Sequence, residues 1–223
     1  METLEKIRKA YTEYVLENGK QPTSVFQFVK KLKISEADFY NDYASFDAIE
    51  ADVWLTFFNE AKATVEADET YLGYSVREKL LAFYYTWIEL LKSQRSFVVY
   101  SFGRLREESK GQGGPTAGLS RFKPKSQVLN PFKDAFFDYI RDLLAEGRES
   151  REVEPRPFVT DRYPDAFWMQ TLYLLDFWVR DVSKNFEKTD TAIEKAVNTA
   201  FDLIGRSPLD TLFDFAKFIY QNK

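Results

Sequence analysis

The sequence contains no cysteine and no histidine in its 223 residues. Without cysteine the chain can form no disulfide, thiol nucleophile or cysteine-ligated zinc site. Without histidine it cannot build a Ser-His-Asp triad, a histidine general base or a Glu-x-x-His di-iron site. Catalysis would have to rest on carboxylates, lysine or tyrosine, and no recognisable combination of these occurs. We therefore expect a protein that is not an enzyme and that uses no cofactor and no metal.

The sequence also lacks long apolar runs. No uninterrupted run approaches the roughly 18 residues that a membrane-spanning helix needs. The first ten residues, METLEKIRKA, have neither the apolar core nor the small-residue cleavage site of a signal peptide. The sequence therefore predicts a cytoplasmic protein with no membrane span. Its 44% apolar and 30% charged residues are typical of a globular chain that buries a sizeable core.

Aromatic residues, in contrast, are abundant: 21 Phe, 13 Tyr and 4 Trp make up 17% of the chain. They could fill a packed core or line a cavity for a small apolar ligand, and both interpretations stay open. The segment 80–102 favours a cavity, because its Tyr and Trp side chains carry polar groups that need partners when buried. We expect the ligand pocket to be lined by Tyr84, Trp87, Tyr100, Phe137, Trp168 and Tyr173.

Apolar residues recur every three or four positions along most of the chain, which is typical of amphipathic helices. In the first 66 residues this spacing predicts four helices, which end near residues 18, 32, 43 and 65. The remainder is predicted to be helical at about 75–92, 94–104, 129–146, 163–187 and 190–220. Two connections interrupt it: 103–125, with five of the nine glycines, and 147–164, with three prolines. The predicted fold class is all-α.

Residues 23–49, TSVFQFVKKLKISEADFYNDYASFDAI, resemble the helix-turn-helix of the TetR family of transcriptional regulators. The positions in register with the family's pattern are Thr23, Val25, Phe28, Ile34, Ser35, Tyr40, Tyr43, Ser45 and Ile49. The resemblance implies a TetR-like fold, with a helix-turn-helix head at 1–48 and a helical ligand-binding and dimerisation domain at 49–223. It also implies a homodimer whose two heads bind DNA half-sites about one helical turn apart, and a small apolar ligand that changes their separation.

The resemblance further implies roles for residues of the head. The helix that begins at Ser35 would be the recognition helix, and Thr23 and Tyr40 would contact phosphates. We expect the DNA-binding surface to consist of Thr23, Ser24, Lys33, Ser35, Glu36, Tyr40 and Asn41.

The two long helices near the end of the chain are expected to form the dimer interface. Residues 164–186 are apolar on nearly all sides, and a helix of that kind is buried on two faces. We expect the interface to include Leu172, Leu175, Trp178, Val179, Val197 and Phe201. The apolar tail, 207–223, is interpreted as a final helix packed on the body, with contact to a membrane surface or to a partner's groove as alternatives.

The head departs from the family's pattern in its charges. Lys33 stands where the turn usually has glycine, at a position that often needs a positive φ. Residues 1–33 carry seven bases and four acids, whereas 34–61 carry seven acids and no base. Further departures are Asp38, Asp42, Ala44 and Phe46, at positions where phosphate contacts are expected. Because Lys and Arg supply much of protein–DNA affinity, this composition weakens DNA binding.

Two functions follow from these observations. The first is a ligand-responsive TetR-like transcriptional regulator that binds DNA as a dimer. The second is a TetR-fold protein that has lost DNA binding and binds an apolar ligand or lipid. The helix-turn-helix pattern favours the first, while the acidic stretch and the aromatic body favour the second.

Overall fold

The computed structural model describes residues 2–110, 127–156, 159–205 and 218–219, and this part of the chain contains helices and turns but no strand. The contacts divide the chain into two compact units. Unit 1 comprises residues 1–63 and 87–136, and unit 2 comprises 64–86 and 137–223. The all-α prediction is confirmed. Within the described residues, no helix combines the length and the apolarity that a membrane crossing needs.

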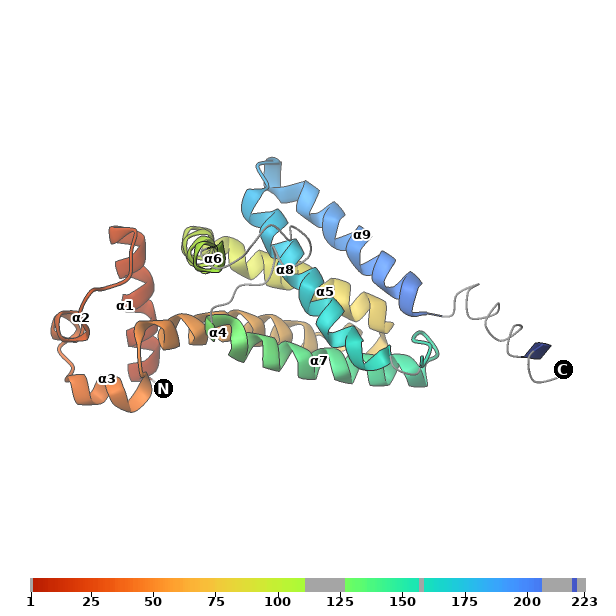
Figure 1. Cartoon of the computed structure of the whole chain (residues 1–223), viewed down its shortest axis with the longest axis horizontal. Helices are drawn as coiled ribbons and strands as arrows, with labels where there is room; N and C mark the ends of the chain where they lie inside the picture. The colour runs from red at the N-terminus through yellow and green to blue at the C-terminus, as the bar shows by residue number, and fades with distance from the viewer. Residues whose placement is uncertain (1, 111–126, 157–158, 206–217, 220–223) are drawn as a thin grey trace. The chain divides into compact units, whose positions relative to one another are not determined.

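Unit 1 begins with three helices and the turns that join them (Figure 1): α1 (Glu2–Asn18), α2 (Val25–Leu32) and α3 (Glu36–Asp42). It also holds most of α4 (Phe46–Glu66), the end of α5 (Val76–Ser93), α6 (Arg95–Lys110), η3 (Gln127–Leu129) and the start of α7 (Asn130–Glu149). Gly19 ends α1 with a φ of 65°, a conformation that glycine adopts without strain. Ser24 then begins α2, because its side chain accepts a hydrogen bond from the Gln27 N–H.

An aromatic cluster forms the core under these first helices. Phe28 contacts Phe39 and Phe46 edge to face, with ring centroids 6.4 and 5.4 Å away. Phe46 also stacks on Tyr11, at 5.9 Å. Phe46, at a position where the resemblance leads us to expect a phosphate contact, thus packs in this core, and aromatic pairs of this kind add to the free energy of simple area burial.

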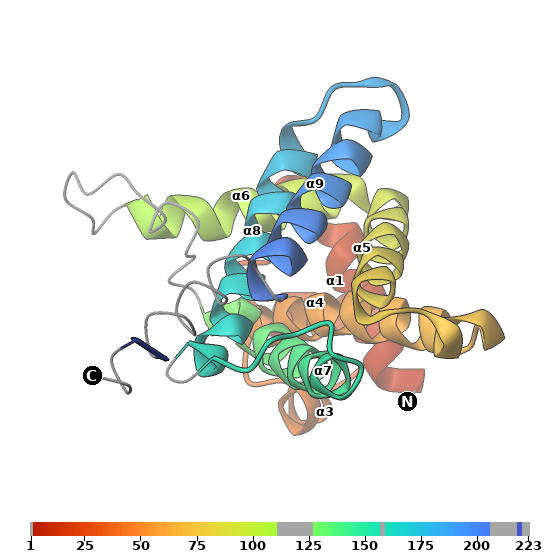
Figure 2. The same cartoon turned by 90° about the vertical axis from the view of Figure 1, so that its right-hand side faces the viewer.

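Unit 2 contains η1 (Glu69–Gly73), η4 (Thr160–Arg162), α8 (Tyr163–Arg180), η5 (Lys184–Phe186) and α9 (Glu187–Ile204), with the remaining parts of α5 and α7. Figures 1 and 2 show α8 and α9 lying side by side. Its interior includes paired hydroxyl groups: Tyr71 and Tyr139 lie 3.0 Å apart, and Tyr84 and Thr171 lie 2.9 Å apart. Buried tyrosine thus has the polar partners that its hydroxyl group needs.

Three helices differ from the prediction, and one of them, predicted at 190–220, is α9, which runs only from Glu187 to Ile204. The helix predicted at 163–187 ends at Arg180, because the Asp181 carboxylate accepts hydrogen bonds from the backbone N–H groups of Ser183 and Thr189 and so holds a turn. The glycine-rich connection was predicted to begin at 103, but α6 continues through Gly103 to Lys110. A single glycine in a helix costs only about 1 kcal/mol relative to alanine, which favourable packing outweighs. The predicted helical tail falls mostly on residues 206–217, outside the described residues.

The Asp181 turn gives a testable dependence on pH. Burial disfavours the charged carboxylate, but hydrogen bonds from Ser183 and Thr189 outweigh it and lower the pKa of Asp181 to about 2. A depressed pKa stabilises the folded state above the unfolded-state pKa of about 3.9, and this is lost as the pH falls towards 2. Asp181→Asn should therefore lower the free energy of unfolding at pH 7, by an amount that shrinks between pH 4 and pH 2. Urea denaturation measures this, and a difference that stays constant over that range would contradict it.

Candidate functional site

The first three helices contain a helix-turn-helix between α2 and α3. The turn is made by Lys33, whose φ of 57° and ψ of 40° are left-handed, and its backbone N–H bonds the Lys30 carbonyl at 3.3 Å. The expectation of a positive φ at this position is thus confirmed, although the residue is lysine rather than glycine. Lys33 is exposed, so its side chain meets solvent while its backbone closes the turn.

The start of α3 is fixed by Ser35 and Asp38. The Ser35 side chain accepts from the Asp38 N–H at 3.0 Å, and the Asp38 carboxylate accepts from the Ser35 N–H at 3.1 Å and from its hydroxyl at 2.7 Å. This reciprocal arrangement is a capping box. These hydrogen bonds lower the pKa of Asp38. Asp38 therefore stabilises the start of α3, which explains why an acidic residue stands at this position.

The residues predicted to contact DNA all lie on the helix-turn-helix of unit 1. Tyr40 is 54% exposed, and Thr23, Lys33, Glu36 and Asn41 are exposed as well. The two serines, Ser24 and Ser35, cap α2 and α3. Their DNA-binding role stays a prediction, as does the domain boundary at residue 48.

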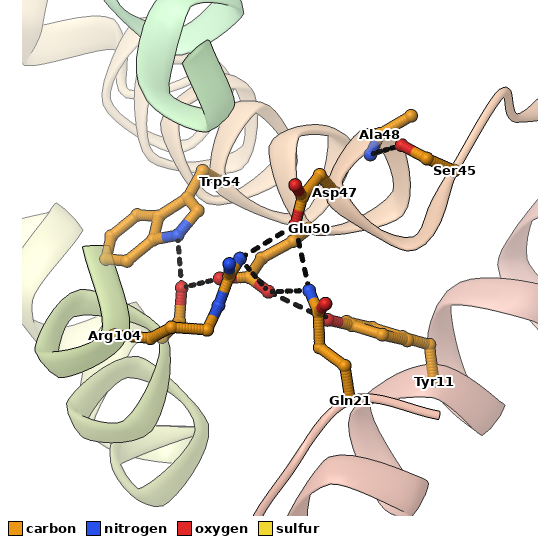
Figure 3. Close-up of polar contacts among 9 residues, drawn as sticks. Tyr11, Gln21, Ser45, Asp47, Ala48, Glu50, Trp54 and Arg104 are labelled. Carbon is orange, nitrogen blue, oxygen red and sulfur yellow. Dashed lines mark hydrogen bonds and ion pairs between the residues drawn. The ribbon is translucent and has the colours of Figure 1, made fainter. Parts of the chain in front are cut away.

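Behind this surface lies a buried carboxylate, Glu50 of α4 (Figure 3). It is fully buried and forms an ion pair with Arg104 of α6, with 3.0 Å between Oε2 and the guanidinium nitrogen. Tyr11 of α1 donates its hydroxyl to the same oxygen at 2.7 Å, and Ser101 of α6 donates to the other oxygen. Burying a charge costs much free energy unless the charge is paired and hydrogen-bonded, and Glu50 is both.

The neighbours of Glu50 extend this cluster to the segment before α2. The Gln21 amide donates to the Tyr11 hydroxyl, to Asp47 and to Glu50, at 2.9, 2.9 and 3.2 Å. Arg104 also pairs with Asp47 at 2.9 Å. Burial and the neighbouring Glu50 carboxylate raise the pKa of Tyr11 far above its usual value, so its hydroxyl remains a donor. The Glu50 cluster, which we define as Tyr11, Gln21, Asp47, Glu50, Ser101 and Arg104, therefore joins α1, α4 and α6.

A second ion pair uses another acid of the same stretch. Asp52 lies 3.5 Å from Arg8 of α1 and accepts a hydrogen bond from Tyr43. Three of the seven acids between 34 and 61 thus hold the head together through Arg8 and Arg104 and do not present free charge to DNA. On α3 itself, Glu36, Asp38 and Asp42 remain exposed.

Sequence reasoning missed the Glu50 cluster, because Glu50 was counted only as a surface acid. A signal was nevertheless present: Glu50 is in helical register with Trp54, Phe57 and Ala61, all of which are buried. An acid on the apolar side of a helix requires a buried partner. The partner, Arg104, lies 54 positions further along the chain, and periodicity alone cannot identify it.

Unit 2 contains an open groove of about 950 Å³ between α8 and α9. Its surface is mainly apolar and includes Tyr173 and Phe177 of α8 and Ala196 and Leu203 of α9. Among the described residues that line it, four are basic and none is acidic; the basic residues are Arg156, Arg162, Lys188 and Lys195.

Comparison with known proteins identifies the family. Residues 79–219, more than half of the chain, match the model of the tetracyclin repressor-like C-terminal domain. The chain belongs to the TetR family. A solved structure, described as a protein with unknown function from Rhodococcus sp. RHA1, has a TM-score of 0.52 and 11% identity, and the alignment covers 91% of this chain and 95% of that one. This likeness shows the fold alone. No curated protein matches the chain.

The six residues predicted to line a ligand pocket are divided between the two units. Trp87 and Tyr100 belong to unit 1, and the other four belong to unit 2. Tyr84 and Trp87 are fully buried, and the Tyr84 hydroxyl bonds Thr171. Trp168 is buried and Phe137 half-buried, whereas Tyr173 is 41% exposed and lines the groove between α8 and α9. Of the six, the structure thus places only Tyr173 at this groove.

The residues predicted for the TetR-family dimer interface lie mainly in the core. Leu172, Leu175, Trp178 and Val197 are fully buried within the subunit, Phe201 is 3% exposed, and Val179 is half-buried. A fully buried side chain cannot reach a second subunit. Which residues of α8 meet a second subunit stays a prediction, because a helix that is apolar all round gives no sequence signal for which side is covered.

The turn at Lys33 makes a prediction about stability. A left-handed conformation costs about 1–2 kcal/mol for a residue other than glycine, so Lys33→Gly should raise the free energy of unfolding by about 1 kcal/mol. The matched control is Lys31→Gly, an exposed position inside α2, which should lower it by about 1 kcal/mol. Urea denaturation compares the two, and equal losses would show that the turn is not left-handed.

The Glu50–Arg104 ion pair makes a second prediction. Arg104→Met leaves a buried charge without its cation and should lower the free energy of unfolding by about 3 kcal/mol. Adding Glu50→Gln removes the buried charge and keeps one acceptor oxygen, at the cost of replacing the other oxygen by an NH2 donor, so the double variant should be more stable than Arg104→Met alone. The control is Arg141→Met, which breaks an exposed pair with Asp138 and should cost below about 1 kcal/mol. Equal losses for Arg104→Met and Arg141→Met would contradict the interpretation.

Proposed function

We propose that this TetR-family protein is a transcriptional regulator that binds DNA as a homodimer through α2, the Lys33 turn and α3. The observation that carries the proposal is the geometry of that turn: a left-handed residue followed by a capped helix whose outer residues, including Tyr40, are exposed. Such a helix is available for insertion into a major groove, with its N-terminal residues next to the bases.

The charges of the head indicate how DNA affinity would arise. Three exposed bases, Lys30, Lys31 and Lys33, lie at the end of α2 and in the turn. They supply the phosphate contacts that α3 lacks. Glu36 and Asp42 oppose binding through their charge, although one acid in the groove can accept from cytosine N4. We therefore expect weak, strongly salt-dependent binding to DNA.

Ligand response would reach the head through the Glu50 cluster. Arg104 and Ser101 of α6 bond to carboxylates of α4, and Tyr11 of α1 donates to one of these carboxylates, that of Glu50. A ligand that favours another position of α6 must break or rearrange these bonds, and α1 and α4 then move with them. Because packed, hydrogen-bonded elements have discrete arrangements, a small shift of α6 becomes a change in the DNA-binding head.

A second candidate is supported by the surface of α3, which carries Glu36, Asp38 and Asp42 and, within its seven described residues, no base. A TetR-fold protein with such a helix could retain the body as a binder of an apolar ligand or lipid and bind no DNA. For this candidate the head keeps its fold because Asp38 caps α3 and Phe46 packs in the core.

A genomic DNA selection at about 50 mM salt distinguishes the two candidates. The regulator should enrich a two-fold symmetric site, and Tyr40→Ala should reduce affinity for it at least tenfold through loss of a phosphate contact. The matched control is Tyr85→Ala, another partly exposed tyrosine outside the head, which should leave the affinity unchanged. Recovery of no enriched site, together with an apolar molecule that co-purifies in native mass spectrometry, would establish the second candidate instead.

A further inference from the structure

Side chains four positions apart share one face of a helix, so the residues of α3 can be sorted by face. Phe39 and Tyr43, the residue that follows the helix, are buried. Asp38 and Asp42 share the next face, and both line a groove of about 340 Å³ that α1 also lines and that Asn41 borders. Two faces remain, and their residues are all exposed: Glu36 with Tyr40, and Ala37 with Asn41.

The three acids of α3 differ in their surroundings. Asp38 is occupied, because its carboxylate accepts hydrogen bonds from the N–H and the hydroxyl of Ser35. Asp42, at the end of α3, lines two grooves that Leu4 of α1 also lines, so it is turned towards α1. Glu36 stands at the first position of α3, and the N-terminal residues of a recognition helix lie next to the bases. Glu36 is therefore the acid of α3 that is placed to accept from a base.

Two polar side chains on the exposed faces have free hydrogen-bonding groups. Among the residues that the structure describes, neither Glu36 nor Asn41 has a hydrogen-bond or ion-pair partner. The Asn41 amide offers a donor and an acceptor, which match N7 and N6 of adenine, whereas the Glu36 carboxylate offers acceptors alone, which match the N4 amino group of cytosine. Ala37 shares the Asn41 face, and its small side chain lets the helix approach the bases closely.

We propose that α3 reads adenine through Asn41 and cytosine through Glu36 in each half-site. This inference rests on the proposed DNA binding and deepens it by naming the bases that are recognised.

An acid on the recognition helix would then contribute specificity rather than affinity. The major-groove edges of guanine and thymine present acceptors, O6 and N7 or O4, which a carboxylate repels. Specificity is a difference of affinities, so a group that weakens binding to every sequence still discriminates when it weakens binding to the wrong base more. The Glu36 charge acts in this way, while the lysines of α2 and its turn supply attraction to phosphates.

Selection from a random library of double-stranded DNA at about 50 mM salt tests the base preferences. The wild-type site should contain an adenine and a cytosine in each half-site, and replacing either should lower affinity about tenfold. Glu36→Gln should change the preferred base at the cytosine position to adenine, because glutamine pairs bidentately with adenine. The matched control is Asp42→Asn, which removes the same charge from the side of α3 that faces α1. It should raise affinity without changing any base preference.

Asn41→Ala provides an independent test at the other position. It should make binding indifferent to the base at the adenine position and keep the preference for cytosine. Base preferences that stay the same in Glu36→Gln and Asn41→Ala, at a site that is still bound, would overturn this inference and leave the proposed DNA binding intact. An equal change of preference in Asp42→Asn would overturn it too, by showing an effect of charge without contact. No enriched site for either the wild type or Asp42→Asn would overturn both proposals.

Discussion

The head of this protein depends on one buried charge, the carboxylate of Glu50. A buried carboxylate without partners would be expelled or neutralised, so its presence dictates where Tyr11, Gln21, Ser101 and Arg104 must be. Those residues come from α1, the segment before α2, and α6. Glu50 itself lies on α4. Pairing its charge therefore fixes the arrangement of three helices, α1, α4 and α6.

The ion pairs of the head change how the acidic residues at 34–61 affect DNA binding. Counted along the sequence, the seven acids without a base at 34–61 argue against DNA binding by the head. In the structure Asp47 and Glu50 pair with Arg104, and Asp52 pairs with Arg8. Asp38 caps its own helix. The electrostatic penalty for DNA is thus confined mainly to the exposed face of α3, next to the lysines that end α2.

The sequence was sufficient to predict the all-α fold and the position of the helix-turn-helix. It was insufficient to predict which side chains form ion pairs and hydrogen bonds across helices. Helical spacing located α1 to α5 and α7 closely, and the register of Ser35 and Tyr40 identified the helix-turn-helix. The end of α8 was missed because Asp181 stops the helix through hydrogen bonds to Thr189, eight positions away, whereas apolar spacing continues past it. The ion partner of Glu50 and the outward face of α8 both depend on tertiary packing, which a local pattern does not contain.

In the proposed regulator, the charge contacts to DNA phosphates come from the lysines of α2 and its turn, because α3 carries no base. The most direct measurement is the salt dependence of affinity for a selected DNA fragment. Three lysines from each of two heads predict a slope of log affinity against log salt of about −5, from about 0.9 per neutralised phosphate. Replacing the three lysines by glutamine should bring the slope close to zero. A slope that is already close to zero in the unaltered protein, or no measurable affinity at any salt concentration, would contradict the account.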